Sequence, residues 1–194
     1  MAKLWQKNNL PKNELAKIVE QFTVGNDRNL DLLLAKHDVI GSLAHTKMLA
    51  QVGLLTKEEL APIQKELKNI YKEILQNNFS IADDNEDIHS EIEFRLTEKL
   101  GDSGKKIHSG RSRNDQVLLD LKLYTREKII EIVLETVTVF NTFIELSEKH
   151  KNKLMPGYTH LQLAMLSSFG LWFGAYAESL VDDIDMLFSA FKIA

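Results

Sequence analysis

The 194-residue sequence contains no cysteine, only three prolines and only nine glycines. Without cysteine the chain has no disulfide framework and no thiolate metal site. Excess positive charge is also missing, because 24 Lys and Arg stand against 28 Asp and Glu, a formal net charge of -4. That balance argues against a nucleic-acid-binding protein. The opening residues 1–6 lack the apolar core and cleavage pattern of a signal peptide, so we expect a cytoplasmic protein.

Long uncharged runs are also scarce. The longest candidate extends from Leu161 to Ala177, and Gln162, Ser167 and Ser168 interrupt it. A membrane-spanning helix needs about 20 mainly apolar residues. We therefore predict that this run forms a helix buried inside a bundle, in a protein whose 44% hydrophobic and 27% charged content is that of a soluble globular chain.

Apolar residues recur at helical spacing through most of the chain, and strand signals are nearly absent. We therefore predict an all-α fold. Thr56 and Glu59 have the spacing of a capping box, which marks a helix start. The other expected helices cover about residues 13–21, 29–52, 87–100, 111–155 and 159 to the last residue, with a loop over 101–110.

A domain boundary is expected near residue 110. Residues 1–110 would form an N-terminal helical domain, and residues 111–194 the first two long helices of an incomplete central helical bundle. Residues 111–155 contain neither Gly nor Pro, so the first of these helices would be about 50–60 Å long. Two such helices with apolar surface on several sides cannot complete a core alone. We expect self-association, because the last helix has many large apolar side chains: Leu171, Trp172, Phe173, Leu180, Ile184, Leu187, Phe188 and Phe191.

Two polar, glycine-containing segments are suited to chemistry. Residues 108–116, HSGRSRNDQ, combine two guanidinium groups with hydroxyls and an amide. An arginine forms two parallel hydrogen bonds with a carboxylate and, in principle, with a phosphate. Residues 155–162, MPGYTHLQ, place a hydroxyl, an imidazole and an amide within four residues. Such groups can orient a substrate and transfer a proton, so the two segments together indicate an enzyme.

Both segments resemble signatures of the argininosuccinate lyases, a family within the fumarase/aspartase superfamily. Residues 108–116 resemble its most specific signature, and residues 155–162 a second signature that the superfamily shares more loosely. Residues 86–89 resemble a third, weaker one, and residues 38–45 resemble the family's second helix. The resemblance covers essentially the whole chain in the right order.

The resemblance implies that argininosuccinate is cleaved to arginine and fumarate by β-elimination in arginine biosynthesis, without a cofactor or metal, by a homotetramer. It implies that the two signature segments of one active site come from different subunits. His160 would take part in proton transfer. The implied substrate-binding residues are Ser112, Arg113, Asn114, Thr159, Gln162 and His89.

Three departures from the family pattern stand out. Residues 163–166 read Leu-Ala-Met-Leu where the family commonly has Arg-Ala-Gln-Pro, which removes polar contacts and a stiff helix-start residue. Residues 24–26 occupy the place of a substrate-contacting serine. A Gly-Ser-Ser-x-Met-Pro signature with a catalytic serine does not occur in these 194 residues. The resemblance therefore implies the N-terminal portion of the enzyme, inactive by itself.

Three other functions remain open on the sequence: a non-catalytic structural homologue of the lens-crystallin kind, a self-associating helical module, or another fumarate-releasing lyase. Several residues have a structural interpretation. His37 and His45 lie on the apolar side of a predicted helix. Residues 83–87 lack the glycine and distal glutamate of a calcium loop, so we interpret them as a helix-capping acidic cluster. Gly170 and Gly174 are spaced for close approach of another helix.

Overall fold

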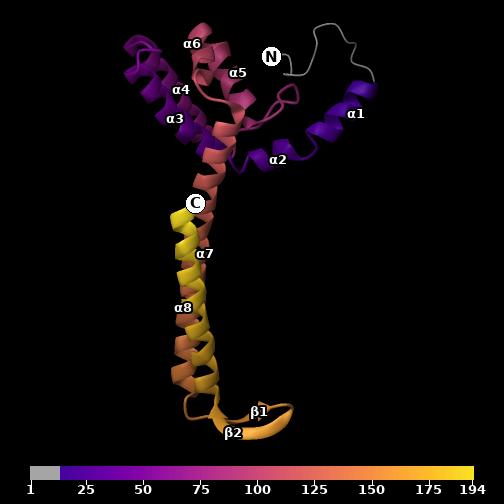
Figure 1. Ribbon diagram of the computed structural model, residues 1–194, viewed down its shortest axis with the longest axis vertical. Helices are drawn as coiled ribbons and strands as arrows, with labels where there is room; N and C mark the ends of the chain where they lie inside the picture. Colours follow the sequence, from indigo (N-terminus) through magenta and orange to yellow (C-terminus); the bar gives the residue numbers. More distant parts are fainter. Residues whose placement is uncertain (1–13) are drawn as a thin grey trace. The chain divides into compact units, whose positions relative to one another are not determined.

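The computed structural model describes residues 14–194, apart from the side chains of residues 14–17 and 20. The chain divides into two compact units, the first ending at Tyr124 and the second covering Thr125–Ala194 (Figure 1). The first unit holds these elements and the start of α7: α1 (Glu14–Thr23), α2 (Asp27–Asp31), α3 (Ala35–Gln51), α4 (Lys57–Leu75), α5 (Ile88–Leu100), α6 (Asp102–Lys105) and the 3-10 helix η1 (Lys106–His108). The second holds the rest of α7 (Arg113–His150), β1 (Leu154–Thr159), β2 (Gln162–Ser168) and α8 (Phe169–Ile193).

The core of the first unit lies between α3, α4 and α5, and α3 packs along α4. Burying each Leu or Ile side chain there contributes about 1.5–3 kcal/mol. The buried apolar residues are Ala35, Val39, Leu49, Leu55, Ile63, Leu67, Ile70, Phe79, Ile88, Ile92, Leu96 and Ile107. The predicted capping box is confirmed, since Glu59 N donates to Thr56 Oγ1 at 3.2 Å and Thr56 N donates to Glu59 Oε2 at 2.9 Å. The fold class predicted from the sequence is confirmed for these helices.

Two local predictions for the first unit are wrong. The helix expected over residues 29–52 is broken into α2 and α3. At the end of α2, Asp31 Oδ2 accepts a hydrogen bond from Ile88 N at 3.2 Å, which ties α2 to the start of α5. Residues 101–110, expected as a loop, contain α6 and η1. Gly104 makes this possible, since a Cβ there would lie 2.4 Å from the Leu96 carbonyl oxygen.

Other helix ends agree more closely with the sequence. The first helix ends at Thr23, and its expected start at Asn13 lies outside the described residues. Asp87 caps α5 by accepting from Ser90 N at 2.7 Å, as the acidic-cluster interpretation predicted. Gly101, with a φ of 62°, ends the same helix.

The second unit contains the largest correction. The helix expected from about residue 159 is wrong, because β1 and β2 form an antiparallel hairpin there and α8 begins only at Phe169 (Figure 1). β1 contains Pro156 and Gly157, which both disfavour a helix, and the strand pairing is irregular between Pro156 and Tyr158. The signal for the true helix start is Ser168, whose Oγ accepts from Leu171 N at 3.1 Å. Residues 161–166, expected to be buried, are exposed.

Within the second unit, α8 runs antiparallel to α7 (Figure 1). A Cβ on Gly170 would lie 2.5 Å from Lys151 Cα, so the predicted close helix approach is confirmed at this glycine. Phe143 of α7 stacks on Phe173 of α8 with 6.1 Å between ring centroids. Among the described residues, no helix combines the length and apolar character needed to cross a membrane.

Candidate active site

The arginine segment, residues 108–116, is held against one face of α3. His45 Nε2 lies 2.9 Å from the carbonyl oxygen of Ser109. A carbonyl can only accept, so this imidazole nitrogen carries the proton. Arg111 donates from Nη2 to Ser42 Oγ at 3.0 Å. Both α3 residues therefore fix the part of the segment that precedes α7.

Three candidate substrate ligands follow directly. Arg113 lies with its Nε 3.1 Å from Asp87 Oδ2 and donates from Nη2 to Ser90 Oγ at 3.0 Å, so it is anchored to the start of α5. Its Nη1 is buried without a hydrogen-bond partner among the described residues. Ser112 and Asn114 are exposed. Ser112 donates from its backbone N to Asp115 Oδ2 at 2.7 Å, and such bonds hold the pKa of Asp115 below its usual range.

A buried acid cluster, consisting of Asp38, His89 and Asp120, lies beneath this segment. His89 Nδ1 is 2.9 Å from Asp38 Oδ1 and 3.8 Å from Asp120 Oδ2. Gln116 donates from Nε2 to the same Asp38 oxygen at 3.3 Å. Burial, with the Asp38 carboxylate next in size, raises the pKa of Asp120 to about 8, and the Arg111 guanidinium opposes the rise. At neutral pH the cluster therefore favours a protonated Asp120.

The cluster also forms part of a small pocket. Its lining consists of Asp38, Ser42, His89, Ile92, Glu93, Ile107, His108, Arg111 and Gln116. Of the side chains in the described part of the chain, Asp38, His89 and Asp120 form the group whose donor atoms, all within 4.8 Å, could share a metal ion. The 2.9 Å between His89 Nδ1 and Asp38 Oδ1 is the distance of a direct hydrogen bond, so a shared proton can join the two groups.

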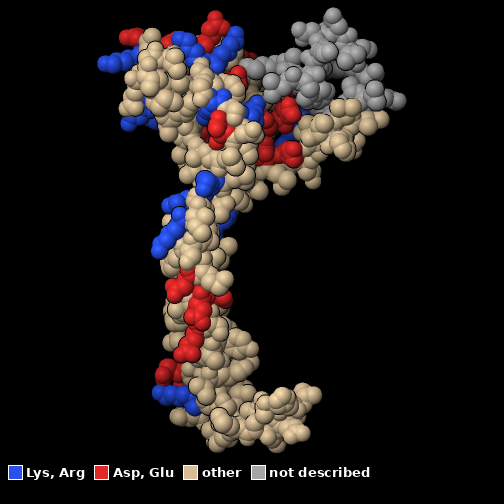
Figure 2. Space-filling model, viewed as in Figure 1, with Lys and Arg blue, Asp and Glu red and all other residues tan. Residues whose placement is uncertain are grey.

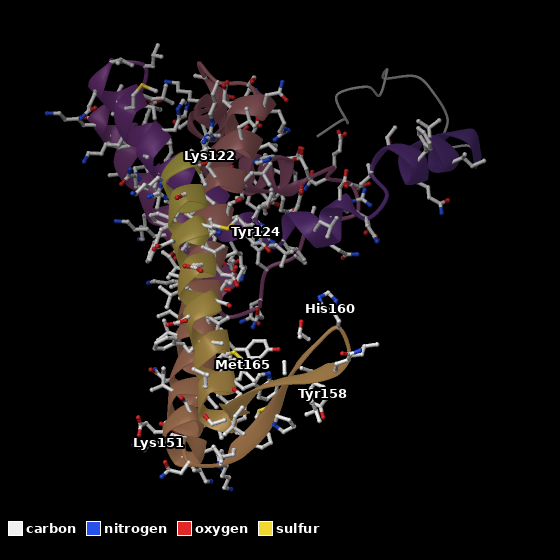
Figure 3. All side chains as sticks on the ribbon, turned by 60° about the horizontal axis from the view of Figure 1, so that its bottom comes forward. Lys122, Tyr124, Lys151, Tyr158, His160 and Met165 are labelled. Carbon is white, nitrogen blue, oxygen red and sulfur yellow. The ribbon has the colours of Figure 1, made fainter. Side chains whose placement is uncertain are left out.

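The second group of candidates forms the hairpin tip, Thr159–Gln162, in the second unit. Thr159 pairs with Gln162, and the two residues between them have positive φ angles, 47° at His160 and 64° at Leu161. Two left-handed residues between paired strands match a type I′ turn, which normally takes Asn and Gly. His160 projects from this tip (Figure 3) and is exposed. A strained backbone that presents an imidazole is typical of a functional site.

Sequence reasoning thus found residues that fall into two groups, one in each unit. It missed Asp38, Gln116 and Asp120. For Gln116 and Asp120 the available signal was their i, i+4 spacing, which places two polar side chains on one face of the predicted helix. Leu166 stands where the family commonly has a proline, and we predicted that this position starts a helix. That prediction is wrong, because Leu166 lies in β2 opposite Pro156.

Solved structures with a similar backbone identify the class of fold. The chain superimposes on the fumarate lyase:delta crystallin of Brucella melitensis with a TM-score of 0.76, at 18% identity, over 95% of this chain and 47% of that one. It also superimposes on the β-carboxy-cis,cis-muconate cycloisomerase of Acinetobacter calcoaceticus with a TM-score of 0.65, at 20% identity, over 90% of this chain and 40% of that one. The fold is that of the fumarate lyases.

The sequence places the chain more narrowly. Residues 12–193 match the family model described as Lyase, and the chain belongs to that family. It is 60% identical over 191 residues to the argininosuccinate lyase of Bacteroides fragilis, and 59% identical to that of Bacteroides thetaiotaomicron. Each match covers 98% of this chain but 42% of the relative, so the chain spans about two fifths of their length.

Proposed function

We propose that a protein containing this chain cleaves argininosuccinate to arginine and fumarate, as a step of arginine biosynthesis in the cytoplasm. The observation that carries the proposal is the identity of about 60% to argininosuccinate lyases across 98% of the chain. The geometry supports it, because the arginine segment presents groups suited to carboxylates and the hairpin tip presents an exposed imidazole. We also propose that a domain boundary lies near residue 110.

In this reaction a base removes the proton from the carbon next to a carboxylate. The C–N bond then breaks, and arginine leaves with a proton on its guanidinium nitrogen. We assign the binding of carboxylates and of the developing negative charge to Ser112, Arg113 and Asn114, which is stabilisation by fixed charges and dipoles. The buried Arg113 Nη1, without a partner among the described residues, is a donor that a carboxylate would satisfy.

The remaining roles belong to the hairpin tip and to the pocket. His160 would take part in proton transfer, Thr159 would donate to a substrate carboxylate, and Gln162 would orient the substrate. His89 and Arg111 line the same pocket. One of its nitrogens already bonds Asp38, so we assign it a substrate-binding role through the rest of its ring.

Self-association into a homotetramer is the second part of the proposal. Residues 154–177 include no Lys, Arg, Asp or Glu, and the hairpin forms an uncharged surface in Figure 2. Only Gly170 and Ala177 of α8 are buried. Exposed apolar side chains of α8 include Leu171, Trp172, Tyr176, Val181, Met186 and Phe188. A surface of this kind normally marks an interface.

The test uses two inactive variants in a protein of the relatives' full length that contains these residues. His160→Asn and Arg113→Ala should each lower the rate of fumarate release from argininosuccinate at least about a hundredfold. If the arginine segment and the hairpin tip of one site come from different copies, mixed oligomers of the two variants should regain part of the activity. Mixed oligomers as inactive as either parent would refute shared sites. An active His160→Asn variant would refute the assigned chemistry.

A further inference from the structure

Three polar side chains form a stripe along one face of α3. The α3 stripe consists of Asp38, Ser42 and His45, at the spacing i, i+4, i+7 that places residues on one side of a helix. Each of them contacts the arginine segment. His45 bonds the Ser109 carbonyl at 2.9 Å, Ser42 accepts from Arg111 at 3.0 Å, and Asp38 accepts from Gln116 at 3.3 Å.

These three contacts flank the residues assigned to the substrate. Two of them fall before Ser112, at Ser109 and Arg111, and the third falls after Asn114, at Gln116. A segment fixed on both sides by one rigid helix loses most of its backbone freedom before any ligand arrives. The side chains of Ser112 and Asn114 are exposed, and the Ser112 hydroxyl donates to Asp115 Oδ2 at 3.0 Å.

A glycine on α3 shows that this approach is close. A Cβ on Gly41 would lie 2.8 Å from Leu119 Cδ2, so glycine lets the first turns of α7 come near enough for Gln116 to reach Asp38. Asp38 is 1% exposed, and the same Oδ1 also bonds His89 at the start of α5. One buried oxygen thus joins α3, α5 and α7, the three helices around the arginine segment.

We propose that Asp38, Ser42 and His45 are positioning residues that hold Ser112, Arg113 and Asn114 in the arrangement that binds a substrate carboxylate. This inference rests on the proposed function for the identity of the substrate. The inference goes beyond the proposed function, because it assigns a positioning role to side chains that touch no reacting atom. The interaction of His45 is the most accessible to a test, because His45 is only half-buried and outside the core.

The first measurement is amide hydrogen exchange of the 194-residue chain, which needs no catalytic activity. His45→Ala removes the donor to the Ser109 carbonyl, and exchange over residues 109–117 should become about fivefold faster. His45→Gln keeps a side-chain N–H donor and should restore most of the protection. Burial and the Arg111 guanidinium lower the pKa of His45, so a neutral amide is a fair substitute for its imidazole.

Two further variants complete the experiment. Gln116→Met keeps the volume but loses the bond to Asp38, and it should loosen the same residues. Thr46→Val is the matched control, because the Thr46 hydroxyl donates at 2.9 Å and 3.1 Å to carbonyls of α3 itself, at Ser42 and Leu43. It should leave residues 109–117 unchanged. Equal loosening by the control, or no loosening by His45→Ala and Gln116→Met, would overturn the proposal.

The second measurement is a comparison of KM with kcat for argininosuccinate in the full-length form. His45→Ala should raise KM about fivefold and lower kcat by up to about fivefold, because the segment is assigned both a substrate carboxylate and the developing negative charge, and His45→Gln should reverse both effects. An unchanged kcat/KM in His45→Ala would contradict the positioning role. If none of the proteins, wild type included, cleaves argininosuccinate, the proposed function fails, and the exchange result still decides whether the α3 stripe orders the segment.

Discussion

Replacing Asp120 by asparagine should stabilise the protein, and by more at pH 8 than at pH 5. Asp120 is 1% exposed, and neither of its carboxylate oxygens has a hydrogen-bond partner among the described residues. Burial and the neighbouring Asp38 carboxylate raise its pKa to about 8, with a smaller contribution from Asp31, while Arg111 opposes the rise. An asparagine has nearly the same shape and no charge to desolvate.

The magnitude follows from proton linkage. The unfolded carboxyl titrates near its ordinary pKa of 3.8, and the folded one near 8. Between these values the folded state keeps a proton that the unfolded state has released, so stability falls as pH rises. Each pH unit costs about 1.4 kcal/mol. The contribution of the protonated Asp120 carboxyl to the free energy of unfolding is fully present below pH 3.8 and is lost by pH 8. From pH 5 to pH 8 the wild type would lose up to about 4 kcal/mol that Asp120→Asn would retain.

Urea unfolding at pH 5, 6.5 and 8, followed by circular dichroism, gives the difference in free energy of unfolding between variant and wild type. The other titrating groups cancel in that difference. Asp115→Asn is the control on the same helix. Hydrogen bonds from Ser112 lower the pKa of Asp115, so its stabilising contribution is present above pH 3.8, and the loss in Asp115→Asn should be constant over this range. An Asp120→Asn gain that is equal at pH 5 and pH 8 would refute the linkage argument.

Two further predictions concern the second unit. Gly170→Ala should destabilise by about 1–3 kcal/mol, because the new Cβ would lie 2.5 Å from Lys151 Cα and 2.7 Å from the Ser147 carbonyl oxygen. In Gly174→Ala the new Cβ would lie 3.5 Å from Ser147 Oγ, so this variant should be tolerated. Thermal melts of both variants give the comparison, and an equal loss of stability in the two would contradict the close approach of α8 to α7. Leu161→Gly should stabilise the hairpin by about 1 kcal/mol, since its φ of 64° disfavours a Cβ. A lower melting temperature would argue against strain at this turn.

Features with a local cause were predictable from the sequence. The capping box at Thr56 and the cap at Asp87 depend on residues three positions away, and both were found. The hairpin was missed because the uncharged run after Leu161 has the composition of a buried helix, while its exposure depends on what covers it. The buried acid cluster was missed for a related reason. Asp38 and His89 meet only after α3 and α5 pack, 51 residues apart in the sequence.

In the proposed enzyme, the exposure of the hairpin tip bears on the proton transfer assigned to His160. A proton-transfer group works best where water is excluded, yet His160 is exposed and Leu161 beside it is 98% exposed. The neighbouring strands leave Tyr158 66% exposed and Met165 79% exposed, without any charge between residues 154 and 177. Covering this apolar surface would remove water from the imidazole and provide hydrophobic free energy in the same step. The hairpin of the proposed enzyme should therefore become catalytically competent only in the assembled oligomer, which is why recovery of activity in mixed variants tests assembly and chemistry together.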